Sequence, residues 1–443
     1  MKRFIVVGLT ILLTISTFGF AQSEAGSIFL LIAPSARAGG MGEAHVGLAD
    51  DAYASYWNPA GLGFLEGTEL ALMHVNWLPN LADDMAYDFF AMRKSIPNLG
   101  TVGGHLIYLN LGEQTRTDEI GSELGKFSSY MFAFNLSYST KINERSAFGI
   151  NAKISYQHLT DQGAGAEKGE GSSTDFGFDL GYMKKEFILS KLNMGATITN
   201  IGPKVSFIDP AQADPQPTNF TLGLNYNVLN SENNKLSIVW DINKLLVASY
   251  PDMDWDGDGL IGGFDEDGNE TTKNSFYNND GNQETAHTDP LYKALFTSWF
   301  DDWFLGGDID MASAGNLADG VIGGWDWNDN NGNGNIDADE GEMVESDGGK
   351  YNEYGQKEVG SGDDRSIKNE LNQIVHNFGV EYWYANVFAI RVGYIYDYNG
   401  KLFNPTMGIG LRYGGYGFDF GYTFGEVGHP LENTMRFSLN WAF

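Results

Sequence analysis

The sequence predicts an all-β fold: a transmembrane antiparallel β-barrel of about 14 strands with an N-terminal plug and a large extracellular calcium-loop insertion. From Thr68 onward, segments of roughly ten residues recur in which every second residue is apolar, as in strands that face lipid on one side. The chain is 14% aromatic but only 19% charged. Its last segment also alternates and stops on an aromatic residue, Phe443. These three features are typical of an outer-membrane barrel.

The chain begins with a predicted secretory signal peptide, Met1–Ala21. Lys2 and Arg3 provide the charged start, residues 4–15 the apolar run, and residues 19–21 a cleavage site. Beyond it no apolar run of 18 residues occurs, which excludes a helical membrane protein. The absence of cysteine excludes a lipoprotein anchor, disulfides and a thiolate metal site. We therefore expect the protein in the cell envelope or beyond.

Residues 22–67 are rich in glycine and alanine and show no strand alternation. Turns punctuate them, the last at Asn58-Pro59. Between the breaks we expect a short helix over Ala49–Trp57, capped by Asp50 and stopped by the proline. A compact segment without strands, placed ahead of a long series of strands, predicts a plug.

Two motifs in this segment carry a family resemblance. The first reads FL-x-I-x-x-x-ARA-x-GMG-x-A over residues 29–44, and the second reads DDAYASYWNPAGL over residues 50–62. Together they resemble the PorV/PorQ family of the type IX secretion system. That family is related to the FadL-like outer-membrane barrels, which share the NPAGL element. The plug-motif residues are Arg37, Gly40, Met41, Gly42, Asn58 and Pro59.

We expect strands near residues 68–77, 86–96, 101–111, 127–141, 145–159, 172–185, 190–201, 217–229, 234–246, 370–384, 386–397, 402–413, 415–424 and 432–443. The first nine fall in residues 68–246 and the last five in residues 370–443. An even number is usual in bacterial single-chain barrels. Tight turns such as 97–99 alternate with longer joins such as 112–126, as periplasmic turns alternate with extracellular loops. A soluble β-sandwich has no reason to sort its loops in this way.

The alternation also assigns faces, with Trp240 on the lipid side and its neighbour Asp241 on the lumen side. The inward charges are Lys153, Asp179, Asp241, Arg391, Arg412 and Asp419. Two interpretations remain open: these charges hydrate the lumen, or some of them hold the plug, with Arg37 as the partner of a lumen carboxylate.

Residues 247–369 form an acidic insertion that is far longer than an ordinary loop. Val247–Ser366 contains 28 Asp and Glu against 5 Lys and Arg, a net charge of −23 out of −31 for the whole chain. The alternation of short and long joins places the insertion outside the cell. A stretch this acidic repels itself unless cations neutralise it.

Two segments of the insertion predict Ca²⁺ as that cation. Each has oxygen-bearing residues at positions 1, 3 and 5, a glycine at 6 and a carboxylate at 12, the spacing of a calcium loop. The first ligand set is Asp254, Asp256, Asp258, Leu260 and Asp265. The second is Asp329, Asn331, Asn333, Asn335, Asp337 and Glu340. The alternative is a solvated loop without sites.

Between the two loops, Pro290–Leu305 is predicted to form an amphipathic helix capped by Thr288 or Asp289. We expect its aromatic side chains to pack within a small calcium-stabilised cap; the alternative is that they face a partner protein.

No motif indicates an enzyme. The seven histidines show no HExxH spacing, and neither a G-x-S-x-G elbow nor a P-loop occurs. The charge of −31 argues against nucleic acid as a partner. Catalytic residues are therefore not expected.

The resemblance implies an outer-membrane component of type IX secretion that docks exported cargo at the cell surface and passes it to the attachment machinery. Its implied partners are the type IX translocon barrel and exported proteins with C-terminal signal domains, and outer-membrane lipid surrounds it. The calcium-loop insertion departs from the family pattern and leaves its own role open. The alternatives are a FadL-like transporter of hydrophobic small molecules, and a surface protein whose acidic cap binds partners while the barrel serves as anchor.

Overall fold

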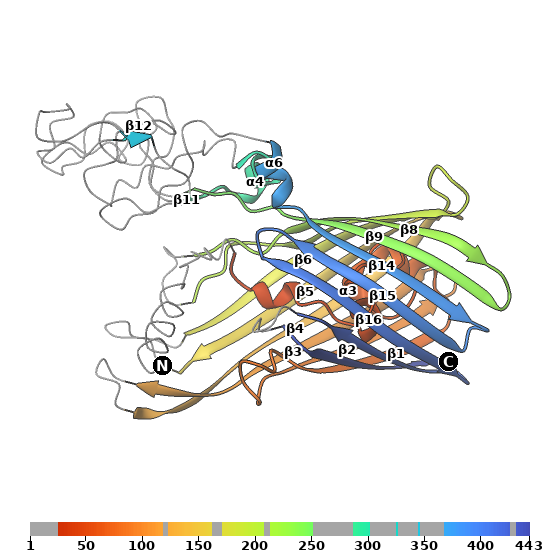
Figure 1. Cartoon of the computed structure of the whole chain (residues 1–443), viewed down its shortest axis with the longest axis horizontal. Coiled ribbons are helices and arrows are strands. Elements are labelled where there is room, and N and C mark those ends of the chain that lie inside the picture. The colour runs from red at the N-terminus through yellow and green to blue at the C-terminus, as the bar shows by residue number, and fades with distance from the viewer. Residues whose placement is uncertain are drawn as a thin grey trace, which may run out of the picture.

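The computed structural model describes residues 25–117, 123–161, 171–207, 213–250, 287–301, 325–326, 344–345, 367–425 and 431–443. The predicted signal peptide and both predicted calcium loops lie outside the described residues. Within the described part, 14 strands form one closed barrel with antiparallel neighbours all round (Figure 1). The predicted antiparallel β-barrel and its strand number are thereby confirmed.

The barrel strands are β1 (Thr68–Asn76), β2 (Ala86–Ile96), β3 (Gly100–Thr117), β4 (Glu123–Asn143), β5 (Ser146–Thr160), β6 (Gly171–Lys184), β7 (Leu192–Ile201), β8 (Asn219–Asn230), β9 (Asn234–Leu245), β14 (Val375–Tyr384), β15 (Phe388–Asp397), β16 (Leu402–Tyr413), β17 (Tyr416–Thr423) and β18 (Thr434–Ala442). Each pairs with its neighbours in sequence order, and β1 closes on β18. Strand β9 pairs directly with β14, so the insertion between them leaves the barrel wall continuous. Two short pairs lie within the insertion, β10 (Ser249–Tyr250) with β11 (His287–Thr288) and β12 (Trp325–Asp326) with β13 (Val344–Glu345).

The predicted boundaries of three strands were wrong. Strand β14 begins at Val375 rather than residue 370, because Ile367–Asn372 form helix α6. Strands β3 and β4 are longer than predicted, because pairing resumes beyond a bulge between Asn110 and Glu113. A bulge shifts the period by one residue, which hides the continuation of a strand from an alternation pattern.

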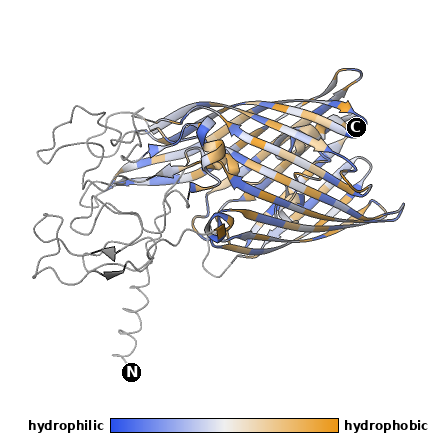
Figure 2. Cartoon of the chain, turned by 90° about the horizontal axis from the view of Figure 1, so that it is seen from above, coloured by the Kyte–Doolittle hydropathy of each residue, from blue (hydrophilic) through white to orange (hydrophobic). Residues whose placement is uncertain are grey.

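The alternation of faces is as predicted. Met435, Phe437 and Leu439 of the last strand are exposed on the outside of the barrel, and the Arg436 and Ser438 side chains between them are buried in the lumen. Figure 2 shows the same pattern as hydrophobic and hydrophilic bands along the strands. Among the described residues, no helix combines the length and apolarity needed to cross a bilayer.

The two ends of the barrel differ. One end, called here the turn end, carries short connections such as 97–99, 231–233 and 414–415 together with the C-terminus (Figure 1). The opposite end, called here the loop end, carries the join of β7 to β8 and the acidic insertion. Short and long joins thus lie at opposite ends of the barrel, as predicted, and the assignment of the turn end to the periplasm stays a prediction.

Residues 25–67 form short helices inside the barrel: η1 (Ile28–Leu31), α2 (Ala36–Gly39), α3 (Ala54–Trp57) and η2 (Pro59–Phe64). Helix α2 packs on β16–β18, and η2 packs on β3–β6, so the segment touches opposite walls. A hydrophobic cluster joins Phe29 and Tyr53 of the segment to Met73, Tyr87 and Phe89 of the wall. The lumen is therefore a packed interior along this side.

The predicted helix over Ala49–Trp57 was wrong in its start and its cap. Helix α3 begins at Ala54, and Asp51, not Asp50, accepts a hydrogen bond from the Tyr53 N–H at 3.0 Å. The proline after α3 starts η2, where its missing N–H is no loss because the first N–H of a helix has no partner within that helix.

In the insertion, helix α4 (Leu291–Thr297) lies inside the range predicted for it, and the residues after Asp301 lie outside the described part until Trp325. The predicted caps were wrong, because Pro290 occupies the cap position without a side-chain bond. Asp289 instead pairs with Lys293 at 2.6 Å and accepts a hydrogen bond from the Thr297 hydroxyl.

Candidate functional site in the barrel lumen

The N-terminal segment runs through the lumen from one end of the barrel to the other. Near the loop end, the Gly26 N–H donates to the Pro215 carbonyl at 2.9 Å, in the connection that follows β7. At the turn end, Thr68 exchanges backbone hydrogen bonds with Phe443, the last residue of the chain. The residues between these points supply the candidate site.

Arg37 ties the segment to the barrel wall. Its Nε and one terminal nitrogen donate to the two oxygens of Glu381 on β14, at 2.8 and 2.7 Å. The other terminal nitrogen pairs with Asp50 at 2.6 Å and Asp51 at 3.1 Å. The arginine is only 7% exposed, so the planar guanidinium is enclosed by carboxylates on two sides.

Glu381 continues the network along the wall. Its Oε2 also accepts from Arg391 on β15 at 2.7 Å, and Arg391 pairs with Asp419 on β17 at 2.9 Å. Arg412 on β16 closes the chain of charges by pairing with the other oxygen of Asp419 at 2.7 Å. Three of the six predicted inward charges therefore join the lumen segment through Glu381, a carboxylate that was not among the predicted residues. The sequence does indicate the inward position of Glu381, because this residue alternates with the outward-facing Phe378 and Val380.

Asp241 makes a second attachment. Its Oδ2 accepts hydrogen bonds from the backbone N–H groups of His45 and Val46, both at 2.7 Å. The carboxylate is fully buried, so it holds a turn of the segment against β9. Lys153 and Asp179, in contrast, pair with each other at 2.8 Å across β5 and β6, and Lys153 donates to Asn200.

The Gly40-Met41-Gly42 motif makes a third attachment by close backbone approach. Gly42 has a φ of +64°, and a Cβ there would clash with the carbonyl oxygen of Phe378. Its N–H donates to the Thr406 hydroxyl at 2.8 Å, and the Met41 side chain is fully buried beside Val239. The motif thus lets the segment lie directly on β14–β16.

Asn58 and Pro59 hold the far side of the segment. The Asn58 side chain accepts from the Ala60 N–H and donates to the carbonyls of Val46 and Tyr182, each at 3.1–3.2 Å. A Cβ at Gly149 on β5 would clash with the Pro59 backbone, and one at Gly181 on β6 would meet the proline ring, so Pro59 also lies directly on the wall. All six plug-motif residues therefore contact the barrel wall. The eleven predicted calcium ligands lie outside the described residues.

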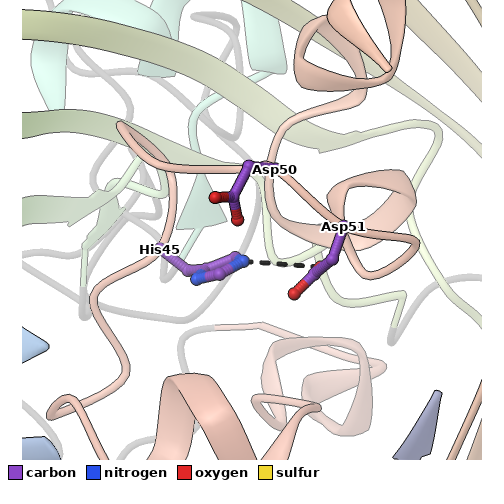
Figure 3. A group of neighbouring side chains, drawn as sticks. All are labelled: His45, Asp50 and Asp51. Carbon is purple, nitrogen blue, oxygen red and sulfur yellow. Dashed lines mark ion pairs between the residues drawn. The ribbon is translucent and has the colours of Figure 1, made fainter. Parts of the chain in front are cut away.

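His45, Asp50 and Asp51 form a candidate metal group among the described residues (Figure 3). Their ligand atoms lie within 4.8 Å of one another, and His45 Nε2 is 3.5 Å from Asp51 Oδ1. Burial alone would raise the pKa of the Asp51 carboxyl, but His45 and Arg37 beside it hold that pKa well below its usual range. Because Arg37 already contacts both aspartates, its charge would repel a divalent cation, and we interpret the group as part of the plug attachment.

A cavity of about 380 Å³ separates the segment from the wall near the loop end. On the segment side it is lined by Leu30, Leu31, Tyr56 and Trp57. On the wall side, polar side chains of β8, β9 and β14 form a series in which each donates a hydrogen bond to the next. The last of them donates to the Gly42 carbonyl of the segment. The linked residues are Asn219, Thr221, Asn243 and Asn377. The lining also includes the charged residues Glu43, Lys153, Asp179 and Asp397. The cavity therefore combines an aromatic side with a polar and charged side.

The chain is similar to several solved barrels. The toluene transporter TbuX of Ralstonia pickettii is 10% identical, with 94% of this chain and 100% of that chain covered at a TM-score of 0.44. The toluene transporter TodX of Pseudomonas putida is 11% identical, with 91% and 95% covered at 0.42. A FadL homologue of Pseudomonas aeruginosa is 10% identical, with 92% and 98% covered at 0.41.

Among curated proteins, none matches the chain. The family model described as type IX secretion system protein PorV matches residues 22–252, which is more than half of the 443 residues. The matched region includes both motifs on which the resemblance was based, together with the lumen segment and strands β1–β9. The chain therefore belongs to the PorV family of type IX secretion system proteins and is an outer-membrane β-barrel.

Proposed function

We propose that this PorV-family barrel docks exported cargo at the cell surface and passes it to the attachment machinery. Its partners in this role are the type IX translocon barrel and exported proteins with C-terminal signal domains. The observation that carries the proposal is the attachment of the lumen segment to the wall by the buried Arg37–Glu381 pair. A lumen held shut in this way suits a docking platform better than a pore.

The proposed plug comprises residues 22–67. Its attachments use different interactions at separate places: the Arg37 ion pairs, the Asp241 hydrogen bonds and the close approach of Gly42. Breaking a buried ion pair by removing one partner typically destabilises a protein by about 3–5 kcal/mol. Because leaving the lumen would break all three attachments, we infer that the segment stays in place while cargo binds.

We propose a binding role rather than an enzymatic one. The buried charged side chains at the turn end of the lumen are engaged with one another in ion pairs, which suits a structural task. The loops available to a partner lie at the loop end, which faces the outside because short turns belong in the periplasm.

We further propose that the acidic insertion binds Ca²⁺ through its two predicted loops. Support comes from the spacing of the oxygen-bearing residues and from the net charge of −23 that the cations would reduce. Extracellular calcium modules bind with dissociation constants of about 0.1–1 mM, which suits a site at the cell surface. Bound calcium would give the insertion a defined shape beside the docking surface.

The docking role is tested by crosslinking in intact membranes, followed by purification of the tagged protein and mass spectrometry. We expect a very large barrel and exported proteins linked through their C-terminal domains. Adding an excess of a purified C-terminal signal domain should reduce the linked cargo and leave the large barrel attached. Purification of the protein alone would contradict the role.

The second candidate is a transporter of hydrophobic small molecules. The cavity favours it, because Leu30, Leu31 and the two aromatic side chains offer an apolar side to a ligand. Native mass spectrometry of the purified barrel distinguishes the two functions. A bound fatty acid or similar molecule without attached cargo would favour transport.

A further inference from the structure

Helix α4 and the turn that follows it pack on the outside of the barrel wall. Phe220 of β8 and Lys244 of β9 lie directly opposite each other in the strand register. Their neighbours Asn219, Thr221 and Asn243 line the lumen cavity, so these two side chains point outward. Figures 1 and 2 agree in placing the helix beside the wall near the loop end.

Both outward side chains contact the insertion. The ring of Trp299, just after α4, meets the ring of Phe220 edge-on with centroids 6.0 Å apart. The Lys244 amine lies 4.0 Å from Asp301 and donates to Gln373, which follows α6. Gln373 in turn donates to Asp301 at 3.1 Å. The helices at the root of the insertion are therefore held on the membrane side of the wall.

The helix buries its small and polar side and exposes its aromatic side. Ala294 and Ser298 are buried, whereas Tyr292, Phe296 and Phe300 are 75%, 74% and 58% exposed. The three aromatic residues are spaced four apart, so they share one face of the helical path. Helix α6 repeats the arrangement with Ile367 and Leu371, which are also exposed. Among the described residues nothing packs over these three aromatics, and the rest of the predicted cap lies outside the described part.

A lipid surface is the occupant that fits this aromatic face. Through Trp299 and Phe220 the face is continuous with the lipid-facing band of the barrel. The position of the helix along the barrel axis also fits a lipid surface. Lys244, which contacts the insertion, lies four residues nearer the loop end than Trp240, an outward aromatic residue stacked on Phe378. Aromatic rings gather where acyl chains meet headgroups, and a lysine is tolerated there but not at the bilayer centre.

We propose that the face formed by Tyr292, Phe296, Phe300, Ile367 and Leu371 lies in the outer leaflet at the boundary of headgroups and acyl chains. It acts as an interfacial anchor of the kind made by amphipathic helices. The insertion, with its net charge of −23, is thereby fixed to the membrane surface at α4 and at α6. This anchoring does not depend on whether the barrel docks cargo.

The absence of native cysteine allows a test by single-cysteine labelling. Phe296→Cys, carrying an environment-sensitive fluorophore, is reconstituted as the full chain in vesicles. Met435→Cys on the lipid-facing wall is the membrane control, and Asn399→Cys in the exposed turn between β15 and β16 is the aqueous control. Heat-modifiable migration on a gel verifies that each variant has formed its barrel.

We expect the label at residue 296 to behave like the membrane control. Its emission should be blue-shifted, strongly quenched by lipids with a nitroxide near the headgroup and protected from iodide in solution. A label that iodide quenches as it does at residue 399, and that lipid nitroxides leave unchanged, would overturn the proposal. Protection that arises only when a protein partner is added would also overturn it, in favour of a protein-docking face.

Discussion

Arg37 and Glu381 are 344 residues apart in the chain, yet they form a buried bidentate ion pair with distances of 2.7 and 2.8 Å. The pair connects the lumen segment to strand β14, the first strand after the acidic insertion. Strand β14 thus holds the lumen segment at the point where the chain returns from the insertion to the barrel wall beside β9.

Replacing Arg37 with alanine should loosen the plug. Glu381, Asp50 and Asp51 would lose a shared partner, and we expect a loss of about 3–5 kcal/mol in unfolding free energy, with raised antibiotic leakage in cells. Arg145→Ala is the matched control, because Arg145 forms an exposed pair with Glu186 and should change stability by about 0–1 kcal/mol. Unchanged permeability in the Arg37 variant would show that the pair does not hold the plug.

Gly42→Ala tests the close approach of the plug to the wall. Both Gly42 and Gly414 have a positive φ, +64° and +58°, so alanine at either position carries a similar backbone strain. Only at Gly42 would the new methyl group meet the wall, whereas at Gly414 it would meet open space. We expect Gly42→Ala to lower the free energy of unfolding by about 1–3 kcal/mol more than Gly414→Ala does. Equal effects would show that strain alone matters.

Asp241→Asn tests the second attachment. The asparagine keeps the size of the side chain but removes the negative charge from the group whose Oδ2 accepts two backbone hydrogen bonds. We expect a loss of about 1–3 kcal/mol and faster hydrogen exchange at the Val46 amide. Asp88→Asn, at an exposed aspartate on β2, should change neither quantity. Slow exchange at Val46 in the Asp241 variant would mean that other contacts fix this turn.

Acid should weaken the plug through Asp51. Because the folded-state pKa of this carboxyl is held below its usual value, its stabilising contribution is present above about pH 4 and is lost as the pH falls further. We expect the melting temperature of the wild type to fall more between pH 5 and pH 3 than that of Asp51→Asn. Identical pH profiles would show that Asp51 is not the group responsible.

Calcium binding should depend on the predicted loops of the insertion. We expect calorimetry to detect binding with dissociation constants of about 0.1–1 mM. Asp256→Ala and Asn331→Ala should each remove one site, and the double variant should remove both. Glu113→Ala, an exposed carboxylate on β3, serves as the control for loss of a surface charge. Binding that persists in the double variant would refute the assignment of ligands.

The sequence predicts the barrel well because strand alternation is a local property. Trp240 and Asp241 reveal their faces without any knowledge of the rest of the chain. The start of α3, the role of Glu381 and the outward face of α4 were not predicted. Each depends on contacts with residues far away in the chain, and a periodic pattern carries no information about them.

The central claim is that the barrel binds cargo at its loop end while the plug stays in place. It is tested most directly by measuring the binding of a purified C-terminal signal domain to vesicles that contain the protein, while recording their ion conductance. We predict saturable binding from the side of the loop end and no conductance. An absence of binding, or a conductance that opens when the domain is added, would contradict the account.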